Sequence, residues 1–308
     1  MSEIFGLFGL GEVAALLGAC LFGLANIIYR SQRAEADVTT ITTYKTWGAA
    51  VFFLGLVILL SLIADVLSMS SSTFFLLSLS VIVGLAFGDL IYLKGQELAG
   101  VSRAFPVAMS FPLVTYILEL IVFREPFQLN KGLGILIIIL GVIFIGRSSI
   151  EADNPEEPDQ KISLNPMSDK IGLLLAGLAA LLWSVGALIL KLGLEDSDPI
   201  VATFVRATVA SVLLVPLFLF SYHKRGHSLP SRRATILILI AGFFGMTLGA
   251  FFYVVAVKFS GASTAAALSA TSPVFTVPLA MIFLKEKANF IVILGTLLSV
   301  VGVVILIL

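Results

Sequence analysis

The chain has 308 residues, of which 59% are hydrophobic and 12% are charged, whereas soluble domains carry about 25% charged residues. Together with a mean hydropathy of +1.09, this composition indicates an integral membrane protein and excludes an ordinary soluble domain. The formal net charge of zero gives no reason to expect a nucleic-acid partner, and the single cysteine, Cys20, excludes an intramolecular disulfide.

Polar breaks divide the chain into ten apolar runs, each close to the 20 or so residues that cross a bilayer. In the first half the runs lie near residues 9–29, 40–64, 72–93, 102–123 and 130–147. In the second half they lie near residues 170–190, 200–222, 233–254, 263–284 and 288–308. No basic region precedes the first run, so we interpret it as a mature helix and not a cleaved signal peptide. The sequence predicts an all-α integral membrane protein with ten transmembrane helices.

A polar segment interrupts the apolar runs at mid-chain. Residues 149–169 include IEADNPEEPDQKISLNPMSD, which is acidic, contains proline and is poor in hydrophobic residues. Such a composition is typical of a solvated linker. We therefore predict one five-helix repeat in residues 1–148 and a second in residues 170–308.

A constant offset of 161 residues relates the two halves. It aligns GVSRAFPVAMSFP (100–112) with GASTAAALSATSP (261–273). The same offset pairs further residues: Asp37 with Asp198, Thr42 with Thr203, Lys45 with Arg206, Gly84 and Gly88 with Gly245 and Gly249, and Tyr92 with Tyr253. Because each repeat has an odd number of spans, the second must enter the membrane from the opposite side. Inverted repeats of this kind build many secondary transporters, with the substrate site near the midplane between the halves.

Each half also carries Gly-x-Ser, a proline, a basic residue followed by Glu, and Gly-x6-Gly. These residues are Gly100, Ser102, Pro112, Glu125, Gly134 and Gly141, with Gly261, Ser263, Pro273, Glu286, Gly295 and Gly302. On this doubled pattern the chain resembles the EamA-type branch of the drug/metabolite transporter (DMT) superfamily. The resemblance implies a ten-helix carrier around a central cavity that works by alternating access. Such carriers move small metabolites, amino acids, sugars, nucleotide sugars or drugs.

Ionisable residues within spans are costly and are candidates for coupling or charge recognition. Lys45 and Arg206 occupy matching repeat positions, either with their ammonium and guanidinium groups reaching the headgroups or as a cationic lining of each mouth. Asp89 has Ala250 as its repeat mate. It could pair with Arg103 as a structural latch, or face the cavity as an acceptor for protons or a substrate amine.

Two further acidic positions favour a plainer interpretation. Glu119 lies about one turn from Arg124, so we expect it at the membrane interface rather than in the cavity, and Glu12 likewise. Glu125 and its mate Glu286 belong to the shared motif, and we interpret both as caps of the helices that follow.

Uncharged polar and aromatic residues supply the candidates for substrate binding. The resemblance implies that helices 1, 3, 4, 6, 8 and 9 line the cavity. The candidates on them are Asn26, Tyr29, Tyr92, Ser110, Trp183, Ser184, Tyr253, Thr271 and Ser272. An unpaired amide such as that of Asn26 is costly in an apolar helix. Tyr92 and Tyr253 have the interfacial aromatic belt as their alternative.

The prolines at matching points, Pro112 and Pro273, are candidate hinges. Each removes an N–H and frees the carbonyl four residues earlier, which is tolerated in a membrane where protein or a watery cavity is adjacent. Interrupted helices in corresponding places of two repeats indicate a transporter's binding site. For the repeated glycines we expect close helix packing and no ligand contact.

The sequence thus predicts a secondary transporter of a small polar or amphipathic metabolite, such as an amino acid, acting in export. The alternatives are proton-coupled multidrug efflux and, outside transport, a lipid scramblase or intramembrane enzyme. HExxH, GxSxG and Walker A motifs are absent, so we expect neither catalysis nor ATP use by this chain. With two histidines and one cysteine, no metal or cofactor is expected. We expect a multi-pass protein of a prokaryotic cell membrane, as a monomer or a larger oligomer.

Overall fold

The computed structural model describes residues 9–32, 35–153, 166–224, 229–283 and 290–308, and within these ranges the regular secondary structure is helical. The helices of the first half are α2 (Leu10–Ser31), α3 (Val38–Leu59), α4 (Ile63–Leu67), α5 (Ser71–Val81), the π-helix η1 (Ile82–Gly88), α6 (Asp89–Ala99), α7 (Val101–Ala108), α8 (Phe111–Val122) and α9 (Leu129–Asp153). Those of the second half are α10 (Pro166–Gly193), α11 (Pro199–Lys224), α12 (Arg232–Gly242), the π-helix η2 (Phe243–Gly249), α13 (Ala250–Ser260), α14 (Ala262–Ser269), α15 (Ser272–Phe283) and α16 (Phe290–Ile307).

Nine helical segments of the described residues are long and apolar enough to cross a membrane. They coincide with nine of the ten predicted runs. The remaining run, near residues 263–284, consists of α14 and α15, which are separated at Ala270 and Thr271. The all-helical membrane class is therefore confirmed, while the arrangement of ten spans as inverted repeats stays a prediction.

Two predicted helix ends are wrong by about one and a half turns. The third and eighth runs were expected to end near residues 93 and 254, but α6 and α13 continue to Ala99 and Ser260. Lys94 does not end the helix, because it pairs with Glu97 at 2.8 Å one turn later. The helices end instead at Gly100 and Gly261, whose φ angles of 79° and 85° favour glycine.

The predicted linker is helical at both of the ends that the structure describes. Helix α9 continues to Asp153 and α10 begins at Pro166, so helical backbone enters both ends of the segment 149–169. The middle of this segment, together with His227 and Glu286, lies outside the described residues.

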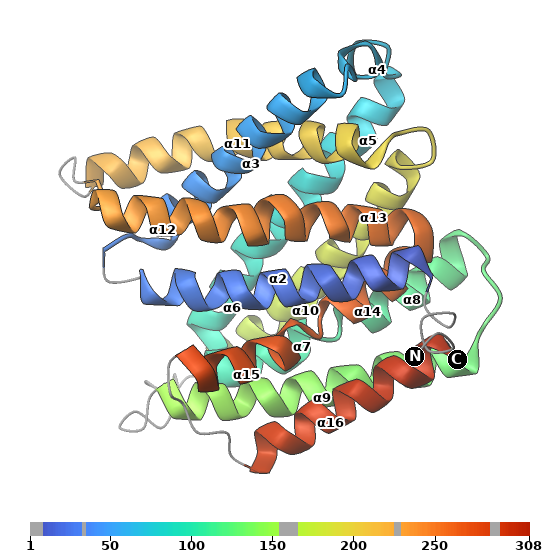
Figure 1. Cartoon of the computed structure of the whole chain (residues 1–308). Helices are drawn as coiled ribbons and strands as arrows, with labels where there is room; N and C mark the ends of the chain where they lie inside the picture. Colours follow the sequence, from blue (N-terminus) through green and yellow to red (C-terminus); the bar gives the residue numbers. More distant parts are fainter. Residues whose placement is uncertain (1–8, 33–34, 154–165, 225–228, 284–289) are drawn as a thin grey trace.

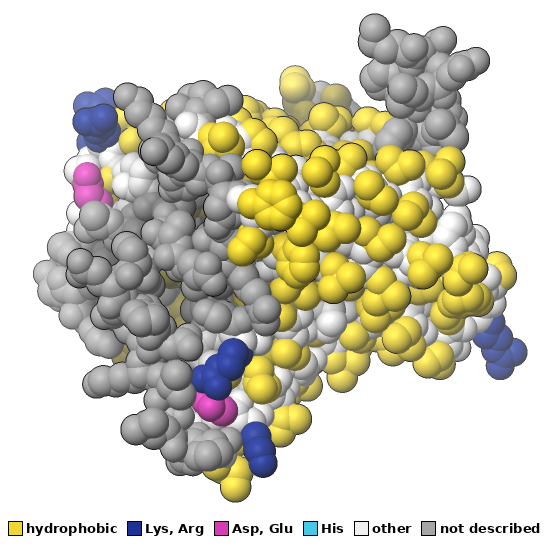
Figure 2. Space-filling model, turned by 90° about the horizontal axis from the view of Figure 1, so that it is seen from below, with side chains coloured by type: hydrophobic (Ala, Val, Ile, Leu, Met, Phe, Trp, Pro, Cys, Tyr) yellow, Lys and Arg dark blue, Asp and Glu magenta, His cyan; other side chains and the backbone are white. Residues whose placement is uncertain are grey.

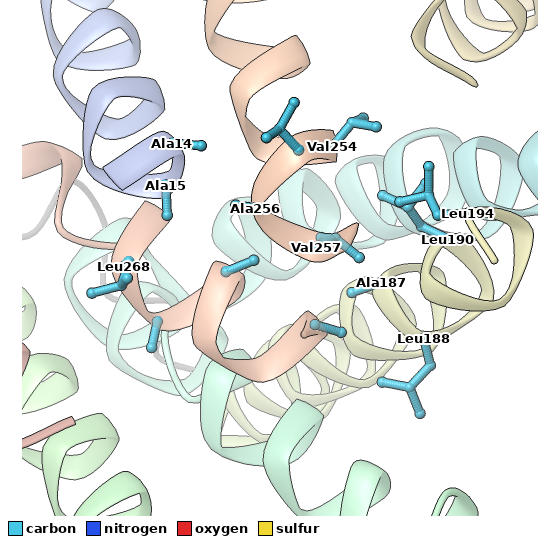
Figure 3. Close-up of a cluster of buried hydrophobic side chains, with 14 of the residues drawn as sticks. Ala14, Ala15, Ala187, Leu188, Leu190, Leu194, Val254, Ala256, Val257 and Leu268 are labelled. Carbon is cyan, nitrogen blue, oxygen red and sulfur yellow. The ribbon is translucent and has the colours of Figure 1, made fainter. Parts of the chain in front are cut away.

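The long helices lie side by side as a bundle, and the start of α2 and the end of α16 lie at the same end of it (Figure 1). Hydrophobic side chains cover most of the visible described surface on the face seen from below, where few charged side chains appear (Figure 2). Leu59 and Leu174 are 78% and 73% exposed, which suits contact with lipid tails. Small and branched apolar residues of α2, α10, α13 and α14 form a buried cluster that joins the two halves (Figure 3).

Helices α9 and α16 lie against each other along a seam of glycines (Figure 1). A Cβ on Gly141 would lie 2.6 Å from the backbone nitrogen of Ser299 and 2.5 Å from the carbonyl oxygen of Gly295. A Cβ on Gly302 would meet Ile138 in the equivalent way, at 2.7 Å from its backbone nitrogen. The predicted packing role of these glycines is confirmed.

The contacts of this seam repeat when the halves are exchanged. Gly134 approaches Leu306, and its repeat mate Gly295 approaches Ile145, the mate of Leu306. The element bounds repeat as well, because η1 and η2, α6 and α13, α7 and α14, and α8 and α15 are each offset by 161 residues. The two halves therefore share backbone irregularities as well as sequence.

The two π-helices were not predicted from the sequence. A Cβ on Gly88, at the end of η1, would lie 2.6 Å from the Trp183 ring. A Cβ on Gly249, at the end of η2, would lie 3.3 Å from the ring of Phe22, the repeat mate of Trp183. Each π-helix thus ends in a glycine against which one aromatic side chain of the other half packs, and π-helical turns are frequent at functional sites.

Candidate functional site

An exposed carboxylate inside a predicted span is the centre of the candidate site. Asp89 begins α6 directly after η1, and its Oδ1 accepts a hydrogen bond of 2.9 Å from the indole Nε1–H of Trp183 in α10. The rings of Tyr92 and Phe111 lie 5.1 Å and 5.7 Å from the Trp183 ring, edge to face. We call Asp89, Tyr92, Phe111 and Trp183 the Asp89 cluster. It combines a carboxylate with an aromatic wall drawn from both halves.

Lys45 in α3 carries the positive charge that acts on Asp89. The two groups attract each other electrostatically, yet among the described residues neither has an ion-pair partner within 4.0 Å. The ammonium of Lys45 lies 5.2 Å from the centre of the Tyr29 ring. Charged groups in spans are costly unless paired. Asp89 and Lys45 are therefore opposite charges that interact electrostatically but form no ion pair with each other.

Arg206, the repeat mate of Lys45, is bonded differently. Its guanidinium donates to the hydroxyl of Ser80 in α5, and it interacts electrostatically with Tyr253 in α13. The position that corresponds to Asp89 is Ala250, so no carboxylate is present there. The two halves thus place a cation at matching points but an acid in the first half only.

Two further predicted residues lie on α2. Asn26 is exposed, and no hydrogen bond of its amide occurs within the described part of the chain. The hydroxyl of Tyr29 is buried without a hydrogen-bond partner, and its ring packs on Ala36, Ile41 and Ile238. Asn26 thus keeps its amide exposed on the helix that also carries Phe22, whereas the Tyr29 hydroxyl is enclosed.

The predicted hinges lie at real helix breaks. Pro112 is at the start of α8 and Pro273 at the start of α15, each directly after a two-residue break. At these breaks the hydroxyl of Ser110 donates to the carbonyl of Val107, and that of Thr271 to the carbonyl of Leu268, both at 2.6 Å. The hydroxyls that sequence reasoning assigned to substrate bond to the backbone here.

Ser184 and Ser272 complete the predicted set. Ser184 is fully buried, and its hydroxyl shares its proton between the carbonyls of Phe111 and Ala180, at 2.9 Å and 2.8 Å, which joins α10 to the start of α8. Ser272 begins α15, and its carbonyl accepts from Thr276 at 3.0 Å. The substrate contacts assigned to Ser110, Ser184, Thr271 and Ser272 stay predictions.

Arg103 does not pair with Asp89, so the latch considered from the sequence is wrong. Its guanidinium donates two hydrogen bonds to Asp169, at 2.7 Å and 3.1 Å. Asp169 is in the first turn of α10, in the segment expected to be a linker. Helix α10 begins earlier in the chain than predicted, so Asp169 is helical and lies within reach of Arg103. Asp89 bonds to Trp183 instead.

Glu119 is the residue that sequence reasoning misplaced. It was expected at the interface, but its side chain is fully buried in α8. Its carboxylate accepts from Lys191 at 3.1 Å and lies 3.5 Å from the ammonium of Lys131. Lys191 also pairs with Glu125 at 2.5 Å, and Lys131 lies 3.9 Å from that carboxylate. We call these two acids and two lysines the Glu119 network.

The Glu119 network also holds the start of α14. The carboxylate accepts from the backbone N–H of Ala262 at 2.9 Å, from that of Ser263 at 3.3 Å, and from the Ser263 hydroxyl. Free N–H groups at a helix start are favourable partners for a negative charge. Glu125, expected to cap the following helix, pairs with lysines instead. The sequence held one signal for these ion pairs. Three basic residues lie at span ends on one side of the membrane: Arg124, Lys131 and Lys191.

The family profile described as the EamA-like transporter family matches the chain twice, over residues 9–147 and 170–308. An uncharacterized transporter from Archaeoglobus fulgidus is 25% identical over 96% of both chains. A second uncharacterized transporter of that organism is 33% identical over 46% of this chain and 47% of its own.

A WAT1-related protein from Arabidopsis thaliana is 35% identical over 32% of this chain and 30% of its own. Among solved structures, one crystal structure superimposes with a TM-score of 0.74 at 18% identity, covering 96% of this chain and 94% of the other. At that identity the likeness shows a shared fold.

Proposed function

Because the chain belongs to the EamA-like transporter family of the DMT superfamily, we propose that it is a secondary transporter that exports a small zwitterionic metabolite, such as an amino acid with an apolar side chain. It is an integral, multi-pass membrane protein, and its archaeal relatives support a prokaryotic membrane. The substrate, the direction and the mechanism are the parts that we propose.

The observation that carries the substrate class is the separation of Asp89 from Lys45. A zwitterion would place its ammonium group on the Asp89 carboxylate, whose Oδ1 is held by Trp183, and its carboxylate on Lys45. Its side chain would lie against Tyr92, Phe111 and Trp183. Such a solute would satisfy both charges, which are costly to leave apart inside a membrane.

The proposed mechanism is alternating access between two inverted repeats of five helices. Contacts that interchange under the 161-residue offset support this arrangement, since a two-fold relation between halves produces them. The breaks before Pro112 and Pro273 supply matched points of bending. The Glu119 network holds α8, α9, α10 and α14 together at the end of the bundle where α2 begins and α16 ends.

A single-tryptophan experiment tests the proposed site. The chain has two tryptophans, and Trp47 donates to the Ser211 carbonyl at 3.2 Å, on α3 and α11. In a Trp47→Phe background, Trp183 becomes the fluorophore of the Asp89 cluster. Titration with amino acids, sugars, nucleotides and cationic drugs should change its emission with apolar amino acids.

The charges are tested in the same background. Asp89→Asn and Lys45→Gln should each weaken amino-acid binding at least about tenfold, because each removes a charge-assisted contact. Lys94→Gln is the matched control, since Lys94 is exposed and pairs with Glu97 in the same helix α6. A response to sugars or nucleotides, or equal binding in all variants, would contradict the proposed substrate class.

Proton-coupled efflux of cationic drugs is the second candidate, because an exposed carboxylate beside three aromatic rings also suits an organic cation. Lys45 separates the two functions. Its positive charge should repel such a drug, so Lys45→Gln would strengthen drug binding but weaken amino-acid binding. Proteoliposomes that flip lipid without moving solute would contradict both.

A further inference from the structure

A cavity of about 550 Å³ opens at the end of the bundle where α2 begins and α16 ends. It lies among the start of α2, the start of α9, the junction of α13 with α14, and the end of α16. Its polar lining consists of Glu12, Gln128, Asn130, Lys131, Ser260 and Thr264. The Asp89 cluster does not contribute to it. Its volume is that of a site for a small metabolite.

The charges that line this cavity are not balanced. Lys131 is 9% exposed, and its ammonium is shared between Glu119 and Glu125 and lies 5.3 Å from the Tyr116 ring. Glu12 has no ion-pair partner within the ranges that the structure describes. The Glu119 network is neutral as a whole, with two acids and two lysines. Among the side chains that line the cavity, the uncompensated charge is therefore the carboxylate of Glu12.

We infer that this cavity is a second solute site, which binds a small organic molecule through a primary ammonium group on Glu12. The amides of Gln128 and Asn130 and the hydroxyl of Thr264 offer further donors and acceptors around it. The first-turn position of Glu12 stabilises the start of α2. That role accounts for a carboxylate there, but not for a polar cavity in front of it.

The second site is next to the Glu119 network. Lys131 belongs to both, and Ser260 and Thr264 flank the residues Ala262 and Ser263 that bond to Glu119. The site is independent of the Asp89 cluster, so its test needs no transport measurement.

The test uses one engineered thiol in the full-length protein. Cys20, the native cysteine, is replaced by alanine, and Asn130, which is partly exposed and lines the cavity, becomes cysteine. The rates of modification by an ethylammonium and a sulfonatoethyl methanethiosulfonate are compared at low ionic strength. Putrescine is then added as the competing amine.

We expect the cationic reagent to modify the engineered thiol faster than the anionic one, when each rate is divided by its rate with a free thiol. Putrescine should slow both modifications. Glu12→Gln should lower the preference about fourfold, the size for one charge about 10 Å away in water, and should remove protection by putrescine. Asp196→Asn is the control, since Asp196 is an exposed acid at the same end of the bundle. Protection that persists in Glu12→Gln, or that is absent from the parent, would overturn the inference.

Discussion

The carboxylate of Glu119 accepts hydrogen bonds from both the backbone N–H and the hydroxyl of Ser263. Glu119 belongs to the first half and Ser263 to the Gly-x-Ser motif of the second, so one buried acid joins the two repeats. The position of Glu119 in the second half is taken by Ala280. The bond therefore has no counterpart at the opposite end.

Replacing Glu119 by glutamine should destabilise the protein by about 3 kcal/mol, because two lysine ammonium groups would lose a buried counter-charge. Thermal unfolding in detergent measures the loss. Glu97→Gln is the matched control, because Glu97 is 66% exposed and pairs with Lys94 at the helix surface. Equal unfolding temperatures for the two variants would show that the Glu119 network contributes nothing to stability.

Proton coupling through Asp89 predicts that Asp89→Asn abolishes accumulation driven by a proton gradient, because an amide cannot exchange the proton that a carboxylate carries. Exchange of solute across the membrane should persist at high solute concentration, since the aromatic wall of the Asp89 cluster remains. Proteoliposome uptake with and without an imposed gradient separates the two activities. Normal accumulation by Asp89→Asn, with Asp65→Asn as the exposed control, would exclude Asp89 as the coupling residue.

Gly141→Ala should destabilise the α9–α16 seam by about 2 kcal/mol, because its Cβ would lie 2.5 Å from the Gly295 carbonyl and 2.6 Å from the Ser299 nitrogen. Backbone atoms on both sides leave little room to shift. Gly55→Ala provides the control, since a Cβ there meets nothing within 4 Å and alanine favours helix. Thermal unfolding of both variants measures the two changes in stability. An unchanged unfolding temperature for Gly141→Ala would mean that α9 and α16 can move apart without loss of stability.

Arg103 and Asp169 should show a coupling of about 0.5–1 kcal/mol in a double-mutant cycle of unfolding with Arg103→Gln and Asp169→Asn. The pair has good bidentate geometry, but the Arg103 side chain is 39% exposed, and solvent screens such pairs. Additive effects of the two substitutions would show that the bond does not hold α7 to α10.

The sequence was sufficient for the helical membrane class, because a bilayer requires long apolar runs that hydropathy detects directly. Nine predicted spans coincide with helices, and the remaining one consists of α14 and α15. The family followed from paired motifs, since a repeated Gly-x-Ser and proline at one offset rarely arise by chance. The glycine seam followed from its spacing.

Other features depend on three-dimensional partners that no local pattern contains. Glu119 has an apolar repeat mate, so comparison of the halves gave no signal for its burial. Arg103 finds Asp169 66 residues away, and only because α10 begins earlier than hydropathy indicates. The π-helices η1 and η2 arise from a shift in backbone hydrogen bonding, which side-chain periodicity does not encode.

The glycine seam allows one packing contact to be measured twice in the same protein. Gly134 against Leu306 and Gly295 against Ile145 are one contact present twice in a single molecule. The same substitution can therefore be made at either copy under identical solvent, expression and detergent. Any difference between the two results measures how far the halves have diverged since duplication, free of the errors that separate measurements on two homologous proteins.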